Sequence, residues 1–347
     1  MKYRFLGSSG LLISRITLGT LNFGAPEWGC DEKEAHGILS AFIDAGGNAI
    51  DTANVYAGGK AEEILGRFLP QVPREQIVLA SKCYFPVGAL PNHFGASRKH
   101  ILTSCEASLR RLKTEYVDLY YLHGPDPVAP LEETLRAYDD LVRQGKVRYL
   151  GVSNLFGWQI AKAAGLMRRL GLEPLVAGQY IYSPIHRELE REVIPAAVDS
   201  GLGITCYGVL GAGLLAGKYR GMSEPNQGSR MQVRRQMDGG RFWHPKGLRA
   251  AQAIEAASEK TGIPMAKLAI GWPLGRKFVS SVVLGVRSRA QMLANLEAAD
   301  WSMPQEVWAA IEEQTRPEED NLTWFNRQNY ARIFAAAEFH DERADLP

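Results

Sequence analysis

Four residues of types that take part in carbonyl chemistry stand at or just beyond the expected ends of consecutive strands. Asp51, Lys82 and His123 follow three apolar runs, and Tyr56 lies in the loop after Asp51. A hydride that reaches a carbonyl carbon builds negative charge on the oxygen, so a positioned acid must supply a proton. An ammonium beside a phenol favours the phenolate and lowers the phenol pKa from its ordinary value of about 10. The four side chains therefore predict a site that reduces aldehydes or ketones.

The other two members of the set would support the tyrosine and the substrate. A carboxylate on the far side of the lysine, Asp51, would hold the ammonium charged and in place. A neutral histidine, His123, can orient a carbonyl oxygen by a hydrogen bond. Each residue alone could instead be a strand-end cap, a surface side chain or a satisfied core histidine. Their common placement at strand ends favours the catalytic interpretation.

A repeated unit would bring these strand ends to one rim. Short β-branched runs alternate with amphipathic helical stretches, and eight such units predict an α/β fold, a parallel (β/α)8 TIM barrel, whose active residues lie at the carboxyl ends of the strands. The expected strands are Ile16–Leu18, Asn48–Asp51, Ile77–Ser81, Val117–Leu122, Val147–Val152, Leu175–Gln179, Gly203–Tyr207 and Ser281–Leu284. The expected helices are Glu32–Ala45, Ala61–Leu69, Arg98–Leu112, Leu131–Gln144, Trp158–Leu170, Leu189–Ser200, Leu248–Thr261, Met265–Gly275 and Arg289–Ala299.

Three segments do not fit the repeat. Lys2–Phe5 and Leu11–Ser14 flank a glycine-rich turn and predict a small N-terminal β-hairpin. Tyr219–Gly247 is a long polar loop after the seventh strand, and the tail from Pro317 could close over the pocket or lie elsewhere. No shift in composition marks a linker, so we expect residues 1–347 to form a single barrel domain.

Composition argues against several classes of protein. The net charge of +2 does not point to nucleic acid or to an anionic membrane as a partner. No apolar run approaches the roughly 20 residues that span a bilayer. The 4 cysteines are scattered, which is typical of reduced thiols in the cytoplasm, and His and Cys show no close metal-ligand spacing, so we expect no metal.

The sequences around the candidate residues have a recognisable order along the chain. They are LGSSGLLISRITLGTLNFG (6–24), DTANVYAGGKAEEILG (51–66), VLASKCYFP (78–86), VDLYYLHGPDP (117–127), GKVRYLGVSN (145–154) and VVLGVRSRAQMLANLEA (282–298). Together they resemble the aldo-keto reductase superfamily, and most of all its branch of bacterial general reductases and potassium-channel β subunits. The resemblance implies a (β/α)8 barrel, NADPH or NADP⁺ as cofactor, a small carbonyl or alcohol substrate, and the catalytic set Asp51, Tyr56, Lys82 and His123.

The resemblance also implies which residues contact the cofactor. The nicotinamide end would meet the ends of the first, fifth, sixth and seventh strands, with Tyr207 stacked on the ring. The pyrophosphate would follow the loop from Gly208 to Lys218. Arg287 is the candidate for the 2′-phosphate, because a guanidinium donates to phosphate in a fork. The implied set is Gly19, Thr20, Asp51, Ser153, Asn154, Gln179, Tyr207, Gly208, Val209, Leu210, Gly211, Gly213, Lys218, Gly285, Val286, Arg287, Ser288, Gln291 and Asn295.

Aromatic residues in the loops after strands, and in the tail, suit an apolar pocket at the rim. The expected pocket residues are Trp28, Tyr56, Tyr84, Phe85, His123, Trp243 and Trp324. Arg230, Arg234, Arg235 and Arg241 in the long loop could meet an anionic substrate or the cofactor phosphates, or be solvated. The sequence leaves the substrate and the oligomeric state open. An alternative to the enzyme is a nucleotide-binding, redox-sensing regulatory subunit with little turnover.

Overall fold

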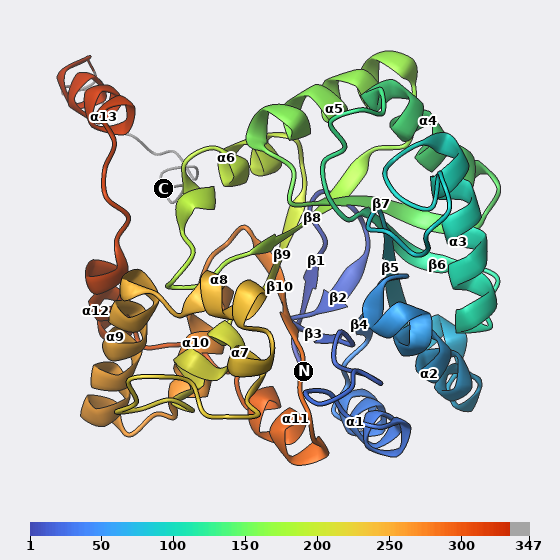
Figure 1. Ribbon diagram of the computed structural model, residues 1–347. Helices are drawn as coiled ribbons and strands as arrows, with labels where there is room; N and C mark the ends of the chain where they lie inside the picture. The colour runs from blue at the N-terminus through green and yellow to red at the C-terminus, as the bar shows by residue number, and fades with distance from the viewer. Residues whose placement is uncertain (334–347) are drawn as a thin grey trace.

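Eight parallel strands close into a barrel at the centre of the molecule (Figure 1). The computed structural model describes residues 1–333. Each strand pairs with its neighbours in sequence, and the last strand closes the ring against the first. The strands are β3 (Ile16–Gly19), β4 (Ala49–Asp51), β5 (Val78–Cys83), β6 (Val117–Leu122), β7 (Val147–Ser153), β8 (Leu175–Ile181), β9 (Gly203–Tyr207) and β10 (Val279–Leu284). The predicted barrel and its eight strands are confirmed.

Both faces of the barrel strands are buried, which explains their uninterrupted apolar sequences. Ile50 and Leu79 belong to the core between the barrel and its helices. Ala49 and Ala80, their neighbours in sequence, belong to a second core inside the barrel. Alternate residues of each strand therefore point into and out of the barrel.

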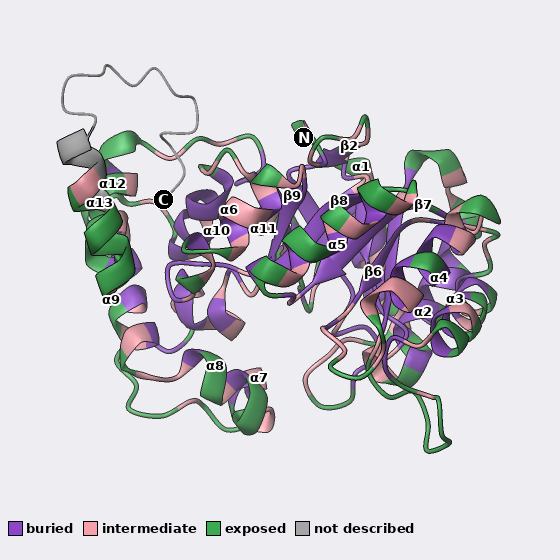
Figure 2. Cartoon of the chain, turned by 90° about the horizontal axis from the view of Figure 1, so that it is seen from above, coloured by how far each residue is buried: buried purple, intermediate pink, exposed green. Residues whose placement is uncertain are grey.

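The predicted N-terminal hairpin is confirmed. β1 (Tyr3–Phe5) and β2 (Leu12–Ser14) pair antiparallel, and Leu6 between them is fully buried in the core inside the barrel. Gly7 has φ +57°, and a Cβ there would lie 2.4 Å from the carbonyl oxygen of Gly201, so this close turn requires glycine. In Figure 2 the hairpin lies at the opposite end of the barrel from the loop 219–247.

Helices surround the barrel in the predicted order. They are α1 (Glu32–Asp44), α2 (Lys60–Phe68), α3 (Arg98–Leu112), α4 (Leu131–Arg143), α5 (Gly157–Leu170), α6 (Val193–Asp199), α9 (Pro245–Thr261), α10 (Met265–Leu274) and α11 (Arg289–Leu296). Short 3-10 turns are η1 (Tyr56–Gly59), η2 (Leu69–Gln71), η3 (Arg74–Gln76), η4 (Glu188–Glu190) and η5 (Gly211–Ala216). Of the helices in the described part of the chain, none is both long and apolar enough to cross a membrane.

The helix expected over Leu189–Ser200 is shorter than predicted. A separate 3-10 turn, η4, precedes α6, which begins only at Val193. Pro195 explains the break, because its missing N–H is tolerated in the first turn of a helix but not further along it.

The loop 219–247, here called the insert, contains short helical turns that its polar sequence did not predict. α7 (Arg230–Val233), the π turn η6 (Arg235–Gly239) and α8 (Gly240–Phe242) lie toward the viewer at the carboxyl-end rim of the barrel (Figures 1 and 2). Met231 and Phe242 are buried and anchor the insert to the body. Tyr219 is also buried, and three such residues in so long a segment give no helical period that could be recognised in the sequence.

Two more helices follow α11, and the second of them lies in the expected tail from Pro317. α12 (Gln305–Thr315) packs beside α9, whereas α13 (Asn321–Ile333) lies outside the ring of helices (Figures 1 and 2). The remainder of the predicted tail lies outside the described residues.

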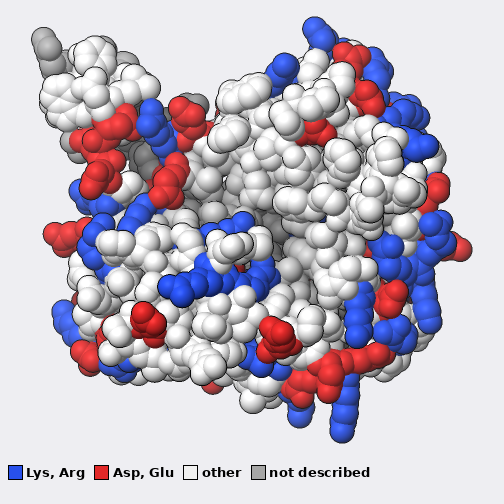
Figure 3. Space-filling view, in the orientation of Figure 1, with Lys and Arg blue, Asp and Glu red and all other residues white. Residues whose placement is uncertain are grey.

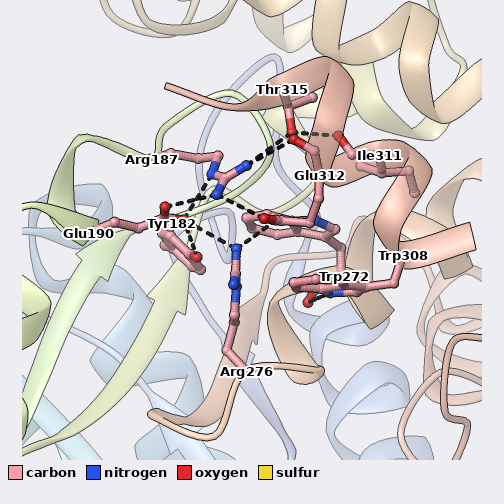
Figure 4. Close-up of polar contacts among 9 residues, drawn as sticks. All are labelled: Tyr182, Arg187, Glu190, Trp272, Arg276, Trp308, Ile311, Glu312 and Thr315. Atoms are coloured by element: carbon pink, nitrogen blue, oxygen red, sulfur yellow. Dashed lines mark hydrogen bonds and ion pairs between the residues drawn. The ribbon is translucent and has the colours of Figure 1, made fainter. Parts of the chain in front are cut away.

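A buried ion cluster fastens α12 to the barrel (Figure 4). Arg187 Nη2 lies 2.8 Å from Glu190 Oε2 and 3.0 Å from Glu312 Oε2. Arg276 Nη2 lies 2.6 Å from Glu312 Oε1 and 3.4 Å from Glu190 Oε1. Tyr182 donates its hydroxyl hydrogen to Glu190 Oε1 at 2.6 Å. We call these five residues the Arg187–Arg276 cluster.

Candidate active site

The pleat of neighbouring strands directs the candidate residues to one end of the barrel. Ala49 and Ala80 lie inside the barrel, and Asp51 and Lys82, two positions further along β4 and β5, face the same way. Asp51 is opposite Ala80 in the strand register, so Lys82 lies two residues beyond the position opposite the carboxylate. His123 follows the end of β6 directly. The carboxyl ends of three neighbouring strands thus supply three of the four groups.

Lys82 joins the candidate residues by three hydrogen bonds. Its Nζ donates to Asp51 Oδ1 at 2.5 Å, to the carbonyl oxygen of Thr52 at 2.8 Å and to Tyr56 Oη at 3.1 Å. The second carboxylate oxygen of Asp51 accepts from Gln179 Nε2 at 2.8 Å. All three ammonium hydrogens are therefore used. The hydroxyl hydrogen of Tyr56, by contrast, has no acceptor among the described residues.

The ring of His123 contacts the ring of Tyr56. The two ring centroids are 5.9 Å apart and meet edge to face, and the Phe85 ring lies 4.8 Å from the imidazole. His123 Nδ1 is buried without a hydrogen-bond partner. Asp51, Tyr56, Lys82 and His123 thus form one group, which we call the Tyr56 cluster.

The turn that carries Tyr56 has an unusual backbone. Ala57 and Gly58 have φ values of 48° and 66°, and Gly59 has φ 96°. A left-handed alanine costs roughly 1–2 kcal/mol relative to the right-handed conformation. Strain of this kind persists where the surroundings fix the backbone, which is common at functional sites.

The titration behaviour of the cluster differs in part from the prediction. Burial raises the pKa of Tyr56, and the opposing charge of Lys82 only partly offsets it, so the expected net lowering is wrong. Burial would lower the pKa of Lys82, but Asp51 and Tyr56 together raise it. Burial and the charge of Lys82 hold the pKa of His123 well below its usual range, so the imidazole is neutral. A protonated phenol, an ammonium and a neutral imidazole suit an acid that delivers a proton.

A second row of polar residues lies beside the cluster. Ser153 Oγ donates to the carbonyl oxygen of Gln179 at 2.8 Å, and Asn154 Nδ2 donates to Ser153 Oγ at 3.0 Å and to the carbonyl oxygen of His123 at 3.1 Å. Tyr207 donates its hydroxyl hydrogen to Asn154 Oδ1 at 2.9 Å. The structure therefore brings four of the expected nicotinamide contacts together at the ends of β7, β8 and β9.

The loop after β9 has four residues in the left-handed region. Gly208, Gly211, Ala212 and Gly213 have φ values of 73°, 56°, 53° and 101°. Backbone N–H groups that such turns leave unpaired can bind phosphate oxygens. Those of Gly211 and Gly213 donate here to the carbonyl oxygens of Gly208 and Leu210. Val209 and Leu210 lie within the same loop; the first is buried and the second half-buried.

Lys218 in the loop after β9 and Arg287 in the loop after β10 are close enough for their charges to interact. Burial lowers the pKa of Lys218, and the positive charge of Arg287 lowers it further. Ser288 caps α11 by accepting from the backbone of Gln291, whose side-chain oxygen accepts from the Arg287 N–H at 2.8 Å. Arg287 is exposed, and Asn295 lies half-buried further along α11. The capping bonds fix the backbone that carries Arg287.

The end of β3 and the loop after it contact both Asp51 and the loop after β10. Thr20 donates its N–H and its hydroxyl hydrogen to the carbonyl oxygen of Asp51, each at 3.0 Å. Asn22 donates to the carbonyl oxygen of Val286 and so links the loop after β3 to the loop after β10. The remaining expected cofactor residues of these two loops are Gly19, which ends β3, and Gly285, which is exposed.

Comparison with known proteins identifies the family. The model of the aldo/keto reductase family matches residues 15–316. A Bacillus subtilis (strain 168) protein named uncharacterized oxidoreductase YrpG is 34% identical over 88% of this chain and 94% of its own length. A probable voltage-gated potassium channel subunit beta of Arabidopsis thaliana is 36% identical over 86% and 92%, and the versiconal hemiacetal acetate reductase of Aspergillus parasiticus is 34% identical over 79% and 85%. The chain belongs to the aldo/keto reductase family.

Aldo/keto reductases are oxidoreductases that generally use nicotinamide cofactors, and membership supports reduction of carbonyl groups by this chain. The structure has already brought the four groups expected for that chemistry to one end of the barrel. Among residues 1–333 no group of three or more His, Cys, Asp or Glu side chains is arranged to hold a metal ion.

Not all of the expected pocket residues of this aldo/keto reductase come together. The ring centroids of Tyr84 and Phe85 are 5.2 Å apart, and Phe85 contacts His123. Trp243 instead packs against Tyr219, 5.6 Å away. Trp28 contacts Arg230 and Arg234 of the insert. Trp324 lies apart from these residues: it is 48% exposed on α13, which the views place away from the mouth.

Sequence reasoning missed three buried polar residues at the rim. Both side-chain polar atoms of Asn54, the hydroxyl of Thr52 and the Oδ1 atom of Asn22 are buried without a hydrogen-bond partner. Thr52 and Asn54 stand within the stretch quoted for the family, so their closeness to Asp51 was the available signal. Unsatisfied buried groups are rare and cluster where a ligand completes them.

Proposed function

We propose that this aldo/keto reductase reduces aldehyde or ketone groups to alcohols with NADPH, and that Tyr56 supplies the proton. The observation that carries the proposal is the contact of Tyr56 Oη with the Lys82 ammonium at 3.1 Å, which leaves the phenol hydrogen free. When bound, the reduced nicotinamide supplies the hydride that reaches the carbonyl carbon. The phenol O–H bond breaks as the carbonyl oxygen takes the proton, and the C=O double bond becomes a single C–O bond.

The surroundings of Tyr56 assist this transfer in both directions. Lys82 stabilises the phenolate that remains, because its charge already opposes the effect of burial on the pKa of Tyr56. Asp51 keeps the ammonium charged and fixed. The neutral imidazole of His123 is placed to donate a hydrogen bond to the substrate oxygen. Oxidation of an alcohol would follow the same steps in reverse, with the phenolate as base.

The residues present fit a nicotinamide nucleotide. The polar row of Ser153, Asn154 and Gln179 suits a carboxamide, and the left-handed loop after β9 suits a pyrophosphate. Lys218 and Arg287 place two positive charges near each other, which favours the additional phosphate of NADPH over NADH.

Steady-state consumption of NADPH and NADH with benzaldehyde and a panel of other aldehydes tests the proposal. Turnover with NADPH should exceed that with NADH, and Tyr56→Phe should lower kcat by about 10²–10⁴-fold. The same variant should still quench its intrinsic fluorescence on binding NADPH, because the phenol oxygen is not among the nucleotide contacts. A Tyr56→Phe enzyme that keeps most of its kcat would contradict the assignment.

A second candidate function is a nucleotide-binding regulatory subunit with little turnover. It is favoured by the relatives named as probable potassium channel β subunits, at 36% and 35% identity. Tight NADPH binding without turnover on any aldehyde of the panel would favour this candidate over the reductase.

A further inference from the structure

Three arginines of the insert gather at the mouth of the barrel. In Figure 3 basic side chains lie over α7 and α8, beside the hollow at the centre of this face. Arg230 begins α7, Arg234 follows that helix, and Arg241 lies in α8. The guanidinium carbons of Arg230 and Arg234 lie 5.2 Å and 4.7 Å from the ring centroid of Trp28, which belongs to the loop after β3. These contacts hold the insert against the rim.

The insert supplies too little negative charge for its arginines. Asp238 is buried and pairs with Arg230, whose Nε lies 2.7 Å from Asp238 Oδ2 and whose Nη2 lies 3.5 Å from Oδ1. Arg234 meets the same carboxylate only through its Nε, at 3.3 Å. Arg241 forms no ion pair with a carboxylate within residues 1–333. Three positive charges thus share one negative charge, which leaves an excess beside the site.

The terminal N–H groups of Arg234 are not all used in hydrogen bonds to protein oxygens of the described residues. Its side chain is 16% exposed, yet the acceptor recorded for its terminal nitrogens is the sulfur of Met237, at 3.4 Å from Nη2. A guanidinium has five N–H donors, and sulfur is a weak acceptor. Burial lowers the pKa of Arg234; Asp238 and the Tyr56 oxygen raise it, and Arg230 and Arg241 lower it. The charge of Arg234 therefore interacts with the reactive phenol, and the terminal nitrogens of its guanidinium lack an oxygen partner among the residues that the structure describes.

Resting on the proposed reductase function, we propose that the preferred substrate is a carbonyl compound with an anionic group, a carboxylate or phosphate, which Arg234 binds at the mouth. Arg230 is held by Asp238 and positions the insert, while Arg234 offers its free N–H pair to the anion in a fork. The carbonyl of the same molecule then reaches toward Tyr56. The cofactor phosphates are the other source of such an anion, and the experiment separates the two.

The test compares 4-carboxybenzaldehyde with benzaldehyde, which share the reacting group and differ in charge. The wild-type kcat/KM should be higher for the carboxylate compound, and Arg234→Gln should lower the ratio of the two values by about 10- to 100-fold, as for loss of a charged hydrogen bond. Arg234→Lys should restore part of the ratio. The control Arg235→Gln removes one charge from an exposed position in the same insert and should leave the ratio unchanged.

Each of the other possible outcomes contradicts either this inference alone or the reductase function as well. If Arg234→Gln weakens NADPH binding by a similar factor and leaves the ratio unchanged, the anion is a cofactor phosphate and the inference is wrong. Turnover of both aldehydes without preference in the wild type also overturns it, while the proposed reductase function stands. Absence of turnover with either aldehyde contradicts the reductase function itself, and this inference with it.

Discussion

The Tyr56 cluster and the Arg187–Arg276 cluster contain the same kinds of residues and differ in how the tyrosine hydroxyl hydrogen is used. Each sets a tyrosine hydroxyl among buried cations and carboxylates. Tyr182 donates its hydrogen to Glu190 at 2.6 Å, whereas Tyr56 accepts from Lys82 at 3.1 Å and keeps its hydrogen free. The bond of Tyr182 joins parts of the chain, whereas the free hydrogen of Tyr56 can be donated to a substrate.

The two clusters also differ in how their charged groups are paired. In the Arg187–Arg276 cluster two guanidinium groups face two carboxylates, and their bonds join the loop after β8 to α12. In the Tyr56 cluster one ammonium is committed to one carboxylate, and the phenol and imidazole beside it have unused polar atoms. Arg276 Nε is also buried without a hydrogen-bond partner, so neither a buried ion pair nor an unused polar atom alone marks an active site. The Tyr56 cluster is distinguished by a phenol hydrogen that remains free beside an ammonium.

The largest expected effect is on catalysis by Lys82. Lys82→Met keeps much of the side-chain length but removes the charge that stabilises the phenolate of Tyr56. We expect kcat for aldehyde reduction to fall by about 10²–10⁴-fold. The matched control is Lys260→Met on the exposed surface of α9, which should leave kcat unchanged. A Lys82→Met enzyme whose kcat is within tenfold of that of wild type would contradict the catalytic role of the Tyr56 cluster.

The corresponding change in the other cluster should affect stability instead. Arg276→Met leaves Glu190 and Glu312 short of one partner, and breaking a buried ion pair costs about 3–5 kcal/mol of unfolding free energy. Denaturant unfolding measures the loss, and Arg276→Lys should recover part of it. The kcat of the folded variant should stay near that of wild type, because no residue of the Tyr56 cluster contacts Arg276. A large loss of kcat without loss of stability would contradict this view.

The sequence predicted the barrel well, because its strands repeat a simple pattern. The four groups of the Tyr56 cluster could also be located, since three of them directly follow or end strands. The insert and tail were less predictable. Arg230 and Arg234 of the insert pack against Trp28 of the loop after β3, and Trp324 lies on α13 outside the ring of helices. No hydrophobic period or strand end fixes a side chain at these positions. The single domain over residues 1–347 and the cytoplasmic location stay predictions.

The net pKa of Tyr56 shows a second limit of the sequence. A neighbouring lysine suggests a lowered value, but the degree of burial decides the sign, and burial depends on every element that surrounds the phenol. The Arg187–Arg276 cluster shows the same limit, because Arg187 and Glu312 are far apart in sequence and no local pattern joins them.

The pH dependence of stability should distinguish the clusters by a smaller effect. The pKa of folded His123 lies well below 6.5, whereas an unfolded histidine titrates near about 6.5. As the pH falls below that value, the unfolded chain binds a proton at this histidine that the folded protein does not bind. The free energy of unfolding therefore decreases by at most about 1.4 kcal/mol per pH unit for this group. His123→Asn should reduce the slope of unfolding free energy between pH 6.5 and 5. Equal slopes for wild type and variant would refute the neutral, buried imidazole.

The most direct measurement is a single-turnover comparison of Tyr56→Phe with Tyr182→Phe, each saturated with NADPH and mixed with an aldehyde. Both changes remove one hydroxyl from an ionic cluster. The account predicts that Tyr56→Phe slows NADPH oxidation by about 10²–10⁴-fold, while Tyr182→Phe reacts like wild type and loses only about 1.5–3 kcal/mol of stability. Equal rates in the two variants would show that the free hydrogen of Tyr56 is not the proton that reaches the substrate.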